Sequence, residues 1–140
     1  MIGRIMYCLD TNVVIAGMTR RAPHLASRLD SELARGTQLI IPIAVLFELR
    51  YGVAKSDRPG KSSALLTQFL GARFEIAEFN IDDATHAAEI RATLERAGTP
   101  IGHYDYLIAA QARRLGATLV TLNSREFSRV PGLQVTDWAA

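Results

Sequence analysis

Residues 5–12 have the sequence IMYCLDTN, in which the apolar run Ile5–Leu9 ends at Asp10. An uninterrupted apolar run is typical of a parallel strand that is covered on both faces. In open α/β sheets, ligands bind just beyond the carboxyl ends of such strands. We therefore expect Asp10 at the end of a sheet where a ligand site would lie, although an aspartate that precedes a helix is also a good N-cap.

Strands and helices alternate along the rest of the chain. Hydrophobic spacing and Gly or Pro breaks predict further strands at 38–41, 75–79, 117–121 and 134–136. The same signals predict helices over 25–33, 43–54, 62–70, 81–97 and 104–115, with turn-forming residues at 55–61. This alternation implies a three-layer α/β/α sandwich with a mostly parallel central sheet and right-handed crossovers.

The composition indicates one soluble domain, residues 1–140. Hydrophobic residues make up 49% of the chain and charged residues 21%, which excludes a wholly disordered chain. The longest apolar run, 39–47, is shorter than the roughly 20 residues of a membrane span, and 5–9 is too short for a signal peptide. The single cysteine, Cys8, cannot form an intrachain disulfide. Together these features favour the reducing cytoplasm and no membrane partner.

The charge is only mildly basic, with a formal net charge of +2. Lys55 and Lys61 are the only lysines among 16 basic residues, and the others are arginines. Arginine suits bidentate contacts with phosphate, but a GC-rich genome would enrich it equally, and composition does not separate the two. The candidates for phosphate contacts are Arg50, Arg113, Arg114, Arg125 and Arg129, and at most one of Arg113 and Arg114 is expected to face a groove.

Two acids lie on helices with apolar surroundings. Glu48 is in the helix predicted at 43–54, whose faces are largely apolar, so we expect it to be partly buried. Asp105 is in the first turn of the helix predicted at 104–115, on the same face as Ile108. A buried carboxylate needs a partner, a proton or a metal. A salt bridge for Glu48 and a helix cap for Asp105 are the structural alternatives.

Asn123 and Glu126 follow the strand predicted at 117–121, so they join Asp10 at the carboxyl end of the sheet. Carboxylates that gather there repel one another unless a cation lies between them. Oxygen ligands select hard cations such as Mg²⁺ or Mn²⁺, and such ions activate water for attack on phosphodiesters. By contrast, we expect a second acidic cluster, 82–89, to be a solvated helix face.

Five segments of the chain support a more specific identification. They are Leu9-Asp10-Thr11-Asn12; Glu48-Leu49-Arg50-Tyr51-Gly52; Ile101-Gly102 with Asp105 and Ile108-Ala109-Ala110; Val120-Thr121-Leu122-Asn123 with Arg125-Glu126-Phe127; and Pro131-Gly132-Leu133 with Asp137-Trp138. In this order and spacing they resemble the PIN-domain ribonucleases, specifically the VapC-type toxins of bacterial toxin–antitoxin pairs. The resemblance covers essentially the whole chain.

The resemblance implies a PIN fold and Mg²⁺-dependent cleavage of RNA, with Mn²⁺ as an alternative ion and tRNA or another structured RNA as the substrate. It also implies a homodimer that is neutralised by a small antitoxin encoded alongside. Asp10, Glu48 and Asp105 match the family's first three acids, which are catalytic and hold the metal. The alternative is a catalytically degenerate PIN-like module that binds RNA or protein.

The fourth position of the site departs from the family pattern. Many members have an aspartate where this chain has Asn123, whereas Glu126 matches an acid of the shorter bacterial subgroup. We predict that Glu126 supplies the fourth negative charge through a water, and that Asn123 orients the metal site by hydrogen bonding. A short helix after Asn123 would bring the two side chains together. In the alternative, Glu126 is a surface acid paired with Arg125 or Arg129.

Overall fold

The computed structural model describes residues 5–139, and its centre is a five-stranded sheet with the strand order β3-β2-β1-β4-β5. Every neighbouring pair of strands is parallel. The strands are β1 (Met6–Leu9), β2 (Gln38–Pro42), β3 (Phe74–Ala77), β4 (Thr118–Val120) and β5 (Gln134–Thr136). This confirms the α/β class, the parallel sheet and all the predicted strands.

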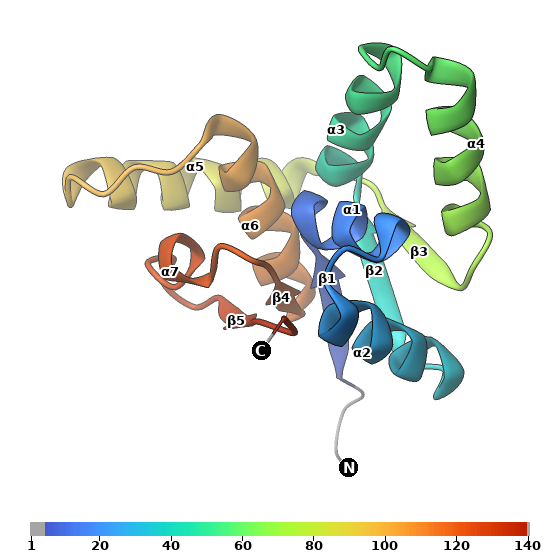
Figure 1. Ribbon diagram of the computed structural model, residues 1–140. Coiled ribbons are helices and arrows are strands. Elements are labelled where there is room, and N and C mark those ends of the chain that lie inside the picture. The colour runs from blue at the N-terminus through green and yellow to red at the C-terminus, as the bar shows by residue number, and fades with distance from the viewer. Residues whose placement is uncertain (1–4, 140) are drawn as a thin grey trace.

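The helices are α1 (Thr11–Thr19), α2 (Pro23–Ala34), α3 (Ile43–Ala54), α4 (Pro59–Leu70), α5 (Ile81–Arg96), α6 (His103–Leu115) and α7 (Ser124–Phe127). Helix α1 packs on α2, and α5 packs on α6, so the sheet lies between helical layers (Figure 1). Helices α3 and α4 extend beyond the carboxyl ends of the strands (Figure 1). Helix α4 begins inside the predicted loop because proline fits the first turn of a helix. None of the helices in residues 5–139 is long and apolar enough to cross a membrane.

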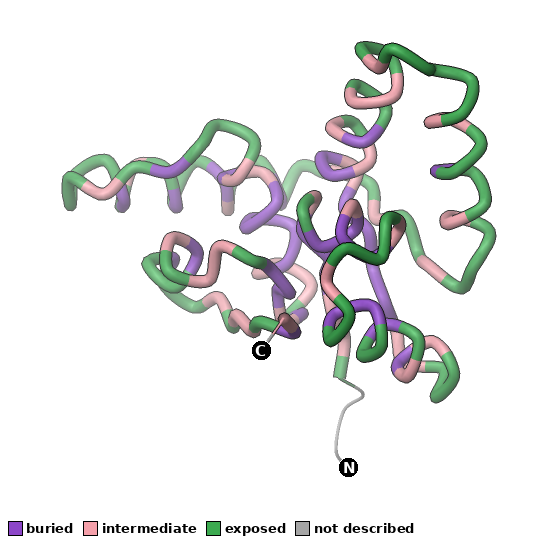
Figure 2. Tube along the Cα trace, viewed as in Figure 1, coloured by how far each residue is buried: buried purple, intermediate pink, exposed green. Residues whose placement is uncertain are grey.

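The core follows the central strands. Cys8, Leu9, Ile41 and Leu119 have no exposed surface, because helices cover both faces of the sheet (Figure 2). Burial raises the pKa of the Cys8 thiol to about 12, which keeps it protonated and unreactive. The core supplies a rigid platform whose upper edge, at the carboxyl ends of the strands, carries Asp10.

Helix α1 has no counterpart among the predicted elements. It contains the β-branched run Val13–Ile15 and Gly17, all of which lower helix propensity. Tertiary burial overrides that preference, since Val13 and Val14 are fully buried. Gly17 is required by packing: a Cβ atom there would lie 2.9 Å from Leu29 Cδ2 on α2.

The acidic cluster of α5 is only partly solvated: Asp82 and Glu89 are exposed, as predicted, but Asp83 is buried. The Asp83 side chain is fully buried, caps its own helix through the Asn80 amide, and accepts a hydrogen bond from Arg114 Nε on α6. His86 Nδ1 accepts a 2.9 Å hydrogen bond from Arg113 Nε, and Glu89 pairs with the same guanidinium at 3.2 Å. The side of α5 that carries Asp83, His86 and Glu89 is therefore in contact with the two arginines of α6.

Candidate active site

Asp10 lies directly after β1, and its carboxylate is held on both sides. Its backbone amide continues the sheet by donating to Val120 O at 3.0 Å. Oδ1 accepts from the Thr11 amide and Oδ2 from Thr121 Oγ1, each at 2.8 Å. The residue is 6% exposed. Asp10 is therefore both the N-cap of α1 and a fixed carboxylate at the carboxyl end of the sheet.

Glu48 approaches this end of the sheet from α3. Thr11 Oγ1 donates a 2.8 Å hydrogen bond to Glu48 Oε1, so one threonine contacts two acids. Glu48 is partly buried, as expected, but its partner is a hydroxyl group and not the arginine of the salt-bridge alternative. The second carboxylate oxygen of Glu48 has no hydrogen-bond donor within the described residues.

The end of β4 contributes the fourth position. Thr121, which is fully buried, accepts a 2.9 Å hydrogen bond from the Asn123 amide. Helix α7 begins at Ser124 and brings Glu126 back to Asn123, whose Nδ2 donates to Glu126 Oε2 at 2.8 Å. The two side chains are therefore adjacent, and Glu126 is paired with Asn123 where the alternative required Arg125 or Arg129.

Two threonines complete a continuous hydrogen-bonded series across the site. In order, the series joins Glu48, Thr11, Asp10, Thr121, Asn123 and Glu126. Neither threonine was predicted to have a role, although both stand where a strand ends beside a site acid. That position, with a hydroxyl able to donate and accept at once, is the signal that could have identified them.

Asp105 faces the series from the first turn of α6. Burial raises its pKa to about 6, and the negative charges of Asp10, Glu48 and Glu126 add to the shift. The Asp105 carboxylate lies close to the start of α6, and glycine at position 102 leaves room for it. A Cβ atom at that position would lie 2.9 Å from Asp105 Oδ2. The three other predicted acids are therefore near enough to Asp105 for their charges to act on its carboxyl group.

The four acids have no positively charged partner. Among residues 5–139, no ion pair involves any of them. Burial raises the pKa of Asp10 above its ordinary value despite the hydrogen bonds from Thr121 and Thr11. An all-oxygen set of mutually repelling carboxylates is the donor chemistry that Mg²⁺ or Mn²⁺ selects.

The four acids lie near one another but do not converge on one point. No three His, Cys, Asp or Glu side chains in the described part of the chain lie close enough to hold an ion by themselves. Mg²⁺ usually keeps several of its waters and binds one or two carboxylates directly. The residues present therefore fit a hydrated cation better than an ion enclosed by protein.

Two of the arginines considered for RNA contacts are engaged elsewhere. Arg113 contacts His86, Glu89 and the Pro131 carbonyl, and Arg114 is paired with buried Asp83. Both guanidinium groups thus hold α5 and α7–β5 to α6, so neither remains available for phosphate. Arg50, Arg125 and Arg129 are exposed.

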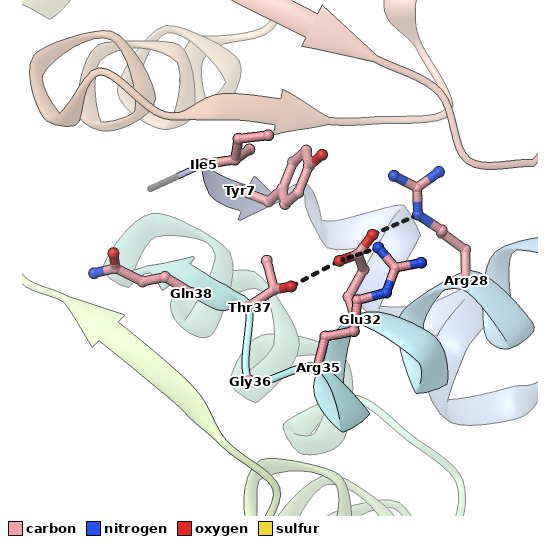
Figure 3. A pocket seen from close by; sticks show the side chains of 8 residues that line it. All are labelled: Ile5, Tyr7, Arg28, Glu32, Arg35, Gly36, Thr37 and Gln38. Atoms are coloured by element: carbon pink, nitrogen blue, oxygen red, sulfur yellow. Dashed lines mark hydrogen bonds and ion pairs between the residues drawn. The ribbon is translucent and has the colours of Figure 1, made fainter. Parts of the chain in front are cut away.

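A different arrangement occupies the opposite, amino end of the sheet. There a recess of about 560 Å³ is lined by Ile5, Tyr7, Arg28, Glu32, Arg35, Gly36, Thr37 and Gln38 (Figure 3). Glu32, only 3% exposed, accepts hydrogen bonds from Arg28 Nε at 2.6 Å and Thr37 Oγ1 at 2.7 Å. Arg35 Nη1 lies 3.7 Å from Glu32 Oε1. Burial alone would raise the pKa of Glu32, but these partners lower it below its ordinary value.

The chain is similar to known proteins over most of its length. Residues 7–133 match the family model described as PIN domain. The chain is 37% identical over 134 residues to the tRNA(fMet)-specific endonuclease VapC of Salmonella typhimurium, covering 96% of this chain and 98% of that protein. Identity and coverage are the same for ribonuclease VapC2 of Rickettsia felis.

Solved structures agree with the sequence matches. The crystal structure of VapBC2 from Rickettsia felis, bound to a promoter DNA fragment, superposes with a TM-score of 0.88 at 34% identity, covering 96% of this chain and 99% of that chain. DNA-bound VapBC from Salmonella typhimurium gives 0.86 at 36% identity, covering 96% and 98%. The similarity therefore extends over nearly the whole length of both chains.

Proposed function

This chain belongs to the PIN-domain family and is a VapC-type endoribonuclease toxin, and from that premise we propose that it hydrolyses RNA with a divalent cation held by its acid cluster. The observation that carries the proposal is the charge of the cluster. Four carboxylates share one site with no cationic side chain among the described residues, and burial together with the charges of the other three raises the pKa of Asp105 to about 6. A bound cation removes that repulsion.

In this proposal Asp10, Asp105 and Glu48 hold Mg²⁺, with Mn²⁺ as the alternative, partly through water. The fourth position is shared: Glu126 supplies negative charge, and Asn123 fixes the Glu126 carboxylate by the 2.8 Å hydrogen bond from Nδ2. A bound divalent ion supplies an activated water and positive charge for the oxygens of the phosphodiester. Glu126 and Asn123 act on the ion's water shell and so tune its affinity.

The chain's own residues give the site its rigidity. Thr121 Oγ1 and the Thr11 amide hold the two oxygens of Asp10, which fixes the orientation of that carboxylate before any ligand arrives. Thr11 Oγ1 leaves one Glu48 oxygen for the site. Such preorganisation means that the groups need not reorient during the reaction.

The substrate and partners follow from the relatives. One relative is named as specific for tRNA(fMet), so we propose tRNA or another structured RNA as the target. The structural neighbours are complexes of a toxin with its antitoxin, so a small antitoxin binds this chain. An Arg or Lys of that antitoxin would compensate the carboxylates by charge-assisted hydrogen bonds. We further propose a homodimer that acts in the cytoplasm.

Incubation of the purified chain with tRNA tests the proposed chemistry. Cleavage should require Mg²⁺ or Mn²⁺, stop on addition of EDTA and resume when the metal is restored. Cleavage that persists in EDTA would rule out the metal. A folded chain that binds RNA but never cuts it, with either metal, would support the degenerate module instead.

Growth of the expressing cell tests the partner. Expression of the chain alone should arrest growth, and co-expression with the small antitoxin encoded beside it should restore growth. The Asp10→Asn variant is the matched control, because it keeps the shape of the side chain and removes its charge. Normal growth during expression of soluble wild-type protein contradicts the toxin role.

A further inference from the structure

An aromatic stripe lies on the exposed side of α3 and α6. We define it as Tyr104 on α6, Phe47 and Tyr51 on α3, and Lys55, which directly follows α3. The three rings are unusually open to solvent, with 49%, 52% and 58% of Tyr104, Phe47 and Tyr51 exposed. Residues 47, 51 and 55 are four apart, so they form one row along the helix. Nothing in the metal chemistry uses these side chains.

Two contacts join the members of the stripe in pairs. The Phe47 and Tyr104 ring centroids are 5.3 Å apart with an interplanar angle of 46°, so the pair connects α6 to α3. Lys55 Nζ lies 4.9 Å from the centroid of the Tyr51 ring. The stripe therefore consists of two contacting pairs, and its end at Lys55 carries a positive charge.

One end of the stripe adjoins the acid cluster. Phe47 directly precedes Glu48, and Tyr104 directly precedes Asp105. The two acids are close enough for Glu48 to raise the pKa of Asp105. Helices α3 and α6 also pack together. The contact between the Phe47 and Tyr104 rings thus lies at the rim of the site, and Tyr51 and Lys55 continue away from it.

We propose that the aromatic stripe stacks unpaired bases of the RNA strand next to the bond that is cut, and that Lys55 holds a phosphate of the same strand. This inference rests on the proposed function and specifies its substrate as a single-stranded segment. Base–aromatic stacking tolerates any sequence because every base has a π face. Aromatic side chains combined with a cation are the usual equipment of single-strand grooves.

The flanking charges favour RNA over a second copy of the chain. Arg50 is exposed beside Tyr51, and Lys55 closes the row. In a symmetric contact the same patch meets itself, so two copies would bring four like charges together. The phosphates of an RNA strand complement these charges.

Substitutions by leucine separate stacking from simple apolar contact. Tyr51→Leu and Phe47→Leu keep a large apolar side chain but lose the π face, whereas Tyr51→Phe keeps the ring. We use a single-stranded RNA of about eight nucleotides that carries 2-aminopurine, whose fluorescence is quenched by stacking. Wild type and Tyr51→Phe should quench it, and each leucine variant should bind about 5- to 100-fold more weakly with little quenching.

RNA that lacks single bases tests whether the stripe and those bases act together during cleavage. After the cut bond has been mapped, single bases on each side of it are removed in turn. At one or more positions the wild-type kcat/KM should fall about 5- to 100-fold, through KM. The leucine variant should already show that loss and lose little more. Independent, multiplicative losses at every position would overturn the proposal.

The design distinguishes the possible failures. Absence of cleavage with normal quenching would reject the proposed function but support the stripe. Normal cleavage with no effect of Phe47→Leu or Tyr51→Leu on quenching would reject the stripe alone. If Tyr51→Glu converts a dimer to a monomer in sedimentation while both leucine variants bind RNA normally, the stripe is a contact between copies and the inference is wrong. Ile81→Ala, at an isolated residue that is 86% exposed, is the matched surface control.

Discussion

Two ends of the same sheet handle buried negative charge in opposite ways. At the amino end, Glu32 is neutralised by Arg28 and Arg35 and accepts a hydrogen bond from Thr37 (Figure 3). At the carboxyl end, Asp105 is surrounded by other acids and has no basic partner within residues 5–139. The pKa of Glu32 is lowered, and that of Asp105 is raised to about 6.

The difference distinguishes a carboxylate that stabilises the folded state from one that destabilises it. Glu32 favours the folded state because its ionised form gains partners on folding. Asp105 disfavours it, because folding removes water from the carboxylate and adds like charges. Strain of this kind persists at functional sites, where stability is given up for activity. Substitutions at the two ends should therefore have opposite consequences.

The largest expected effect is on cleavage. Asp105→Asn removes a negative charge that the proposed metal site needs, so RNA cleavage should fall at least about 100-fold. Glu32→Gln, at the other end, should leave cleavage within about 3-fold of wild type, because no site acid contacts it. Initial rates on the same tRNA at saturating Mg²⁺ measure both. Equal losses in the two variants would remove the functional distinction between the ends.

The fourth position gives the next effect. Glu126→Gln should raise the Mg²⁺ concentration for half-maximal cleavage by about 10- to 100-fold, as loss of a group outside the direct ligands typically does. Asn123→Asp should be tolerated or should lower that concentration, since it adds a carboxylate. Metal titrations of the cleavage rate provide the measurement. If Glu126→Gln leaves the titration unchanged and Asn123→Ala abolishes cleavage, the two roles are reversed.

Stability should change in the opposite direction at the two ends. Glu32→Ala leaves the Thr37 hydroxyl and two arginines without their acceptor, and should cost about 1–3 kcal/mol of unfolding free energy. Asp105→Asn should stabilise the metal-free protein by about 1 kcal/mol, because it removes repulsion. Urea unfolding in EDTA compares the two variants with wild type. Destabilisation by Asp105→Asn would show that its charge supports the fold.

The smallest effect is the pH dependence of stability. The folded-state pKa of Asp105, about 6, lies above its ordinary 3.8, so folding takes up a proton between these values. Its contribution to the free energy of unfolding is greatest below about pH 4 and is lost as the pH rises through 6, a change of about 1 kcal/mol after allowance for partial exposure. Glu32 behaves in the reverse way. Its contribution to the free energy of unfolding is present above about pH 4.5 and is lost on further acidification.

Unfolding of the metal-free protein across this pH range tests both signs. Asp105→Asn should flatten the slope between about pH 4 and pH 7, and Glu32→Gln should flatten it below about pH 4.5. Saturating Mg²⁺ should suppress the first slope and leave the second. A slope that Asp105→Asn does not change would assign the titration to another group.

The sequence was sufficient for the sheet because its strands are short apolar runs bounded by polar or turn residues. It also placed Asp10, Glu48, Asp105 and Glu126 together, since strand ends and helix starts meet at one edge of a parallel sheet. Helix α1 was missed because its propensity favours a strand and only burial makes it helical. Local pattern carries no information on such tertiary contacts.

The environments of the charged side chains were less predictable. Asp83 was expected in solvent but is buried against Arg114, because helical spacing does not reveal which helix will cover a face. Conversely, α3 was expected to be apolar and covered, yet Phe47 and Tyr51 are more than half exposed. The grouping of the site acids could be derived from the sequence, whereas the partners that neutralise or cover each side chain required the structure.

The hydrogen bond from Thr121 to Asp10 joins residues 111 positions apart, and it has a consequence for synthesis of the chain. Until the ribosome has released β4 and the segment after it, Asp10 lacks that donor and the Glu126 carboxylate does not exist. A nascent or prematurely terminated chain therefore cannot assemble the site, however well its first strands have formed. Cleavage that depends on this site can therefore begin only after residues 121–126 have left the ribosome.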